Sequence, residues 1–128
     1  MSGWPVFRSA RDRLNPTYYG EGLIMLFQLT MFPTVKSSRT GSSSAAVAKV
    51  IDIIDRSGLP YKLGPMSTTI EGEWDAVMKM INKARLALRR EYPRLYISIT
   101  IDDRAGAKKR ITGKIESVEK RLGRKVSK

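Results

Sequence analysis

Two short extended segments joined by a Gly-Pro turn constrain the possible folds more than any other stretch of the chain. Residues 61–63 alternate apolar and polar side chains, and the β-branched run over residues 68–70 favours a pleated strand over a helix. Glu71 and Glu73 follow where helical spacing begins, and carboxylates near a helix N-terminus are stabilised by the backbone dipole. The stretch therefore predicts a β-hairpin that leads into a capped helix.

Hydrophobic spacing predicts further strands and helices on both sides of this hairpin. Apolar residues recur at helical spacing in some segments and alternate with polar residues in others. The expected elements are a strand over 25–33 ended by Pro33, a helix capped among Ser42, Ser43 and Ser44 and closed at Gly58, a long helix after Gly72 ended by Pro93, a strand over 95–101, and a last helix capped by Thr112 and closed at Gly123. This order predicts an α+β fold, a ferredoxin-like βαββαβ sandwich with an antiparallel four-stranded sheet and an extra C-terminal helix.

We expect one domain preceded by an arm. A chain of 128 residues can bury a core without support from disulfide bonds. Residues 1–24 show no sustained period and are interpreted as an N-terminal arm outside a domain over residues 25–128. On the first strand, Leu26 and Phe32 share the face that the two helices would leave uncovered. A partly apolar open face predicts self-association through the sheets into a dimer or tetramer.

Composition excludes the commonest catalytic and metal centres. The sequence has no cysteine and no histidine, which removes thiolate nucleophiles, zinc–thiolate sites and histidine-based catalysis. A binding protein without a metal or cofactor is therefore favoured over an enzyme. The remaining enzymatic hypothesis pairs Glu71 with Asp102 or Asp103 as acid and base, although each has a plainer role as a cap or turn former. The longest apolar runs fall short of the ~18 residues that a membrane span needs, so we expect a cytoplasmic protein without membrane contact.

The net charge of +12 leaves an interaction with nucleic acid open. Residues 104–128 contain ten Lys or Arg and two Glu, which a solvated basic end explains most simply. The alternative function is a basic RNA-binding module, because ferredoxin-like folds also carry RNA-recognition modules. Residues 95–100 lack the aromatic run that such modules place on a central strand.

A longer motif around the hairpin resembles the thiamine-binding, YkoF-like family of small ferredoxin-like proteins. It reads Ser57-Gly-Leu-Pro-Tyr-Lys-Leu-Gly-Pro-Met-Ser-Thr-Thr-Ile-Glu-Gly-Glu-Trp74. The family pattern is Ser-Gly, a hydrophobic-Tyr strand, Gly-Pro, and then Thr-x-x-Glu-Gly-Glu-aromatic. The resemblance runs from about Met25 to Leu122. It implies binding of thiamine, its hydroxymethylpyrimidine portion or a phosphate ester, without a catalysed reaction, in dimers or tetramers.

The resemblance assigns ligand binding to Ser42, Ser44, Thr68 and Glu71. Hydroxyl groups can donate to and accept from the nitrogens of an aminopyrimidine. A carboxylate can balance a thiazolium cation or accept a hydrogen bond from the amine. The expected site is thus a group of hydroxyls around one acidic side chain at the hairpin.

Aromatic and basic residues add to this expected site. Phe27, Tyr61 and Trp74 are candidates for stacking and cation–π contacts, while Phe27 and Trp74 also fit core positions. Lys36 and Arg39 lie in a Ser-rich loop and could meet a phosphate group of the ligand, because ammonium and guanidinium groups pair well with phosphate oxygens.

Overall fold

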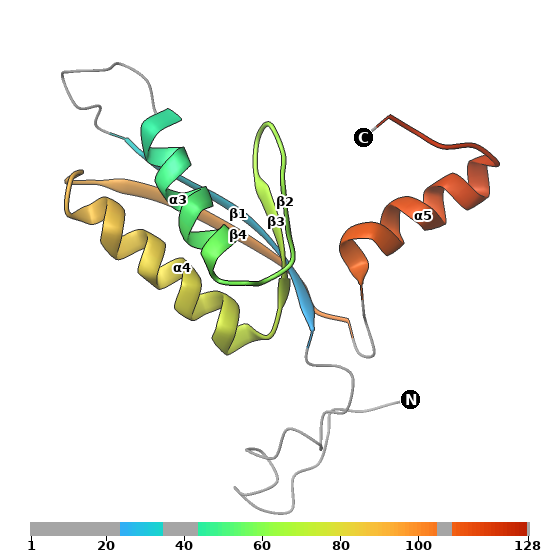
Figure 1. The fold of residues 1–128 in the computed structure, drawn as a ribbon, viewed down its shortest axis with the longest axis horizontal. Coiled ribbons are helices and arrows are strands. Elements are labelled where there is room, and N and C mark those ends of the chain that lie inside the picture. The colour runs from blue at the N-terminus through green and yellow to red at the C-terminus, as the bar shows by residue number, and fades with distance from the viewer. Residues whose placement is uncertain (1–23, 35–43, 105–108, 128) are drawn as a thin grey trace, which may run out of the picture.

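The computed structural model describes residues 24–34, 44–104 and 109–127, and Figure 1 shows how their elements are arranged. The elements are β1 (Met25–Pro33), α3 (Ser44–Arg56), β2 (Tyr61–Leu63), β3 (Thr68–Gly72), α4 (Trp74–Arg89), β4 (Leu95–Asp102) and α5 (Arg110–Leu122). The strands form one antiparallel sheet in the order β2-β3-β1-β4. The predicted α+β, ferredoxin-like architecture is confirmed. The predicted arm falls outside the described residues except for its last residue.

Helices α3 and α4 lie side by side on one face of the sheet (Figure 1). Phe27, Leu29 and Met31 of β1 point towards these helices, because alternate side chains of a strand share a face. Ile54 of α3 and Leu88 of α4 are fully buried against them. The core therefore lies between the sheet and this helix layer.

The turn between β2 and β3 depends on a glycine. The backbone N–H of Gly64 donates to the carbonyl oxygen of Ser67 at 2.9 Å. A Cβ atom at position 64 would lie 2.8 Å from that same oxygen, which is closer than real Cβ contacts. A residue with a side chain would therefore force this turn apart.

The other face of the sheet carries α5, on the opposite side from α3 and α4 (Figure 1). The strand register places Leu26, Gln28, Thr30 and Phe32 on this face, which we call the open face. α5 lies near the end of the open face where Leu26 pairs with Asp102. At the far end, the rings of Phe32 and Tyr96 are 5.2 Å apart, and Tyr96 is exposed.

The start of α5 differs from the sequence prediction. The N-cap residue is Lys109, which adopts the left-handed conformation with φ of 50°, and not Thr112. The Thr112 hydroxyl instead donates to the Lys109 carbonyl oxygen from inside the first turn. The predicted end is confirmed, because Gly123 closes the helix at φ of 71°, which suits glycine.

None of the three helices in the described ranges has the length and apolar character needed to cross a membrane. The longest of them, α4, has 16 residues, and its exposed side carries Lys79 and Lys83.

Candidate functional site

Glu71 lies inside strand β3. The prediction that it lies at the N-terminus of the long helix is therefore wrong. Its register partner is Leu26, and the residue is 7% exposed. Its Oε1 accepts a hydrogen bond from the backbone N–H of Arg110. Because the Lys109 side chain provides no cap, Glu71 caps α5 from strand β3, on the same face of the sheet.

Thr68 lies on the face of the sheet that α3 and α4 cover, whereas Glu71 lies on the open face. Thr68 is 6% exposed and pairs with Leu29, whose side chain is in the core. Directly paired residues of antiparallel strands share a face, and residues three apart on one strand lie on opposite faces. The structure therefore does not bring the Thr68 hydroxyl and the Glu71 carboxylate together.

Two adjoining hollows between α3 and the β2–β3 hairpin contain the other described candidates. Thr68 lines the smaller hollow, which has a volume of about 180 Å³, and Ser44 lines the wider, more open one. Val47, Ile51 and Leu63 line both hollows. We call the combined feature the hairpin hollow. Ser42, Lys36 and Arg39 lie outside the described residues.

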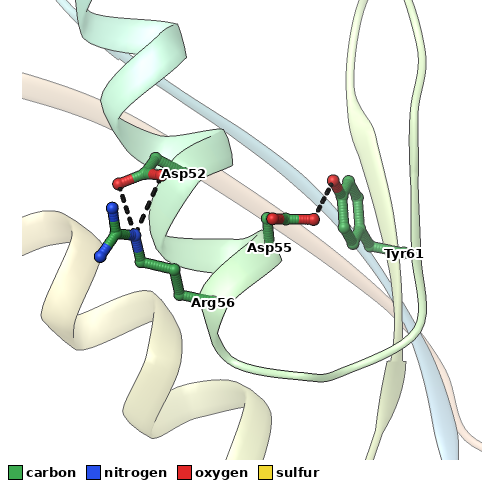
Figure 2. Close-up of polar contacts among 4 residues, drawn as sticks. All are labelled: Asp52, Asp55, Arg56 and Tyr61. Atoms are coloured by element: carbon green, nitrogen blue, oxygen red, sulfur yellow. Dashed lines mark hydrogen bonds and ion pairs between the residues drawn. The ribbon is translucent and has the colours of Figure 1, made fainter.

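An acidic and aromatic pair lies at the edge of the hairpin hollow. Figure 2 shows Asp55 of α3 pointing towards Tyr61 of β2, and the Tyr61 hydroxyl donates to Asp55 Oδ1 at 2.8 Å. Asp52, one turn earlier, points the other way and pairs with Arg56 at 3.1 Å. Asp55 therefore orients the Tyr61 ring, while Arg56 pairs with Asp52.

The hydrogen bond with Asp55 raises the pKa of Tyr61 above its usual value, with smaller contributions from desolvation and from the negative charge of Asp55. The bond is present when the phenol is protonated and is lost as pH rises through this raised pKa. We expect Asp55→Asn to lower the pKa of Tyr61 towards the ordinary value of about 10. Carbon-13 NMR titration of the tyrosine Cζ signals measures this shift. An unchanged Tyr61 pKa in the variant would contradict the assigned cause.

The other two aromatic candidates are placed differently. Phe27 is fully buried in the core, which confirms the core interpretation, and its ring centroid is 6.2 Å from that of Trp74. Trp74 is 49% exposed at the start of α4. Of the three predicted aromatic candidates, Tyr61 lines the hairpin hollow.

Two of the three carboxylates of the enzymatic hypothesis, Glu71 and Asp102, have a structural partner. Glu71 and Asp102 both pair with Leu26 from opposite sides, which places their backbones about 10 Å apart across two strand spacings. Asp102 binds the Lys114 ammonium, and this hydrogen bond holds the pKa of Asp102 below its usual value. Within the described residues, no group of three acidic, histidine or cysteine side chains could hold a metal ion.

Sequence reasoning did not single out Asp55 as a candidate site residue. A usable signal was present, because Asp52 and Asp55 are spaced by one helical turn and therefore lie near one another on α3. The contact between Asp55 and Tyr61 depends on how the chain returns from α3 into β2.

Comparison with known proteins places the chain in a family. The sequence profile described as "Thiamine-binding protein" matches residues 27–119. The chain belongs to the thiamine-binding protein family. The matched residues extend from β1 into α5. They include the β2–β3 hairpin and the residues that line the hairpin hollow.

Relatives in the thiamine-binding protein family carry uninformative names. UPF0045 protein YqgV of Bacillus subtilis is 38% identical over 92 residues, which cover 66% of this chain and 86% of that protein. A UPF0045 protein of Mycobacterium tuberculosis is 35% identical over 77 residues, covering 59% of this chain and 76% of that protein.

A solved structure supports the fold. A Thermotoga maritima protein, whose name proposes a role in thiamine biosynthesis or salvage, superposes with a TM-score of 0.64 at 24% identity. The match covers 74% of this chain and 98% of that protein. At this identity the likeness establishes the ferredoxin-like fold alone.

Proposed function

We propose that this protein binds thiamine, its hydroxymethylpyrimidine portion or a phosphate ester in the hairpin hollow, as a cytoplasmic sensor or carrier without a catalysed reaction. The observation that carries the proposal is the Asp55–Tyr61 pair at the edge of an apolar hollow. Membership of the thiamine-binding protein family gives the class of ligand.

The lining of the hairpin hollow has the chemistry that a flat organic cation needs. Val47, Ile51 and Leu63 provide an apolar floor for an aromatic ring. Asp55 supplies negative charge for a thiazolium or an amine, and the Tyr61 ring supplies a face for a cation–π contact. A carboxylate and an aromatic ring thus lie at one edge of a single apolar surface.

Hydroxyl groups complete the proposed ligand set. The described residues Ser44 and Thr68 line the two parts of the hairpin hollow, and we keep both as donors and acceptors for the pyrimidine. We keep Ser42 in the set on the resemblance alone. The geometry favours Asp55 over Glu71 as the acidic member, because Glu71 lies on the other face of the sheet.

Isothermal titration calorimetry with thiamine, hydroxymethylpyrimidine and thiamine monophosphate tests the proposal. We expect saturable binding of at least one of the three, with a larger affinity for a compound that carries both the aminopyrimidine and the cationic ring. No heat of binding from any of them would overturn the proposed function.

We also propose that the far end of the open face joins a second copy of the chain. Phe32 and Tyr96 form an aromatic pair there, and Tyr96 is 53% exposed. Large exposed apolar groups on one face mark contact surfaces. Sedimentation velocity should show a dimer or tetramer that Tyr96→Glu dissociates, and a wild-type monomer would contradict this part.

A further inference from the structure

A second cavity lies on the opposite side of the sheet from the hairpin hollow, between the open face and α5. Its volume is about 360 Å³, which is large enough for a small metabolite. Gln28, Thr69 and Thr100 line it from three neighbouring strands with uncharged polar groups. We call it the α5 cavity.

Two contacts hold α5 over this cavity. The buried Glu71 carboxylate accepts from the Arg110 backbone N–H, and the Lys114 ammonium binds the Asp102 carboxylate. One contact fixes the first residue of the helix and the other fixes the next turn. The backbone at Arg110 and the side chain of Lys114 are therefore held beside the strands, and both residues line the cavity.

The α5 cavity is positively charged. Lys62, Arg110 and Lys114 line it, with Asp102 as the acidic member among the lining residues. Asp102 offsets the charge of Lys114, to which it is bonded. The lining residues thus carry a formal charge of about +2, and the buried Glu71 carboxylate bonded to the Arg110 backbone lowers the net charge around the cavity to about +1.

Arg110 also has a hydrogen-bond donor without an acceptor. Its Nε atom is buried and has no partner among the described residues. A buried donor without an acceptor carries a desolvation penalty, and nearly all such groups in folded proteins are satisfied. An anionic oxygen in the α5 cavity would supply the acceptor and pair with the guanidinium charge.

We propose that the α5 cavity binds a small phosphate monoester. A monoester carries a charge of about −1.5 to −2 at neutral pH and three terminal acceptor oxygens for the two cationic side chains, whereas a phosphodiester carries about −1 and has two such oxygens. Arg110 and Lys62 contact the phosphate, and Thr69, Thr100 and Gln28 bind the polar remainder. This site is independent of the hairpin hollow, because the sheet separates them.

Titration with glycerol 3-phosphate, followed by calorimetry and by the NMR signal of the Arg110 side-chain Nε–H, tests the proposal. We expect saturable binding that shifts this signal, and binding by dimethyl phosphate weaker by about tenfold because it carries a single charge. Absence of saturable binding by glycerol 3-phosphate would overturn the proposal. So would equal binding of the diester.

Matched variants locate the phosphate. Arg110→Gln retains the backbone N–H that Glu71 caps, and should weaken glycerol 3-phosphate binding by about tenfold. Lys62→Gln, on β2 and outside α5, should weaken it severalfold. Arg124→Gln removes an equal charge beyond the end of α5, outside the cavity lining, and should change affinity less than twofold. Equal losses in Arg110→Gln and Arg124→Gln would overturn the site. A second result would also overturn it: single-stranded RNA binds in a way that depends on Arg110, and glycerol 3-phosphate does not bind.

Discussion

Replacing Phe27 with alanine will lower the free energy of unfolding by about 3–5 kcal/mol, the usual effect of truncating a buried phenylalanine. Phe27 is fully buried in β1, where it pairs with Ile70 of β3 and Ile101 of β4. Its removal leaves a cavity bounded by two neighbouring strands and the helix layer, which cannot close without moving the sheet. Chemical denaturation followed by circular dichroism measures the change.

Met66→Ala is the matched control for Phe27→Ala. Met66 is 87% exposed in the β2–β3 turn, so its truncation should change the unfolding free energy by less than about 0.5 kcal/mol. A loss below about 1 kcal/mol for Phe27→Ala would show that the position is not a central part of the core.

Replacing Asp55 with asparagine will weaken thiamine binding by about 10- to 100-fold, the equivalent of losing a charge-assisted contact. Asp55 lies at the edge of the hairpin hollow, where its carboxylate also orients the Tyr61 ring. Asparagine has nearly the same shape and removes only the charge. Calorimetry with thiamine measures the change in affinity.

Glu71→Gln separates the two acidic candidates. It removes a charge from the other face of the sheet and keeps an oxygen that can accept from the Arg110 N–H. We expect thiamine affinity to stay within twofold of the wild type. A large loss in Glu71→Gln with no loss in Asp55→Asn would return the acidic role to Glu71 and contradict the choice of Asp55.

The order of strands and helices was predictable because each element shows its own hydrophobic period. The alternation over residues 95–101 and the helical spacing after Gly72 both appear in the structure as β4 and α4. The end of β3 was not predictable in the same way. Glu71 fits a helix N-terminus by type, but the strand continues through Gly72 because Glu71 and Gly72 pair with Leu26 and Met25.

That two-residue extension of β3 decides which side chains can meet. Once Glu71 belongs to the strand, its separation of three from Thr68 places the two on opposite faces. Local propensity could not show this, because register is set by pairing with β1, about 45 residues earlier in the chain. The predicted grouping of Thr68 with Glu71 depended on a helix boundary that tertiary pairing moved.

The start of α5 was missed for a related reason. Thr112 has the residue type of a helix cap, and Lys109 in the left-handed conformation does not. The cap comes from Glu71, 39 residues away. A cap from so distant a residue leaves no local signal in the sequence.

An NMR titration of isotope-labelled protein with thiamine shows whether the ligand binds in the hairpin hollow, because the two faces of the sheet carry different residues. We expect the largest amide shifts on the hairpin hollow, at Val47, Asp55, Leu63 and Thr68. Shifts confined to residues of the open face and α5, with none in the hairpin hollow, would contradict it.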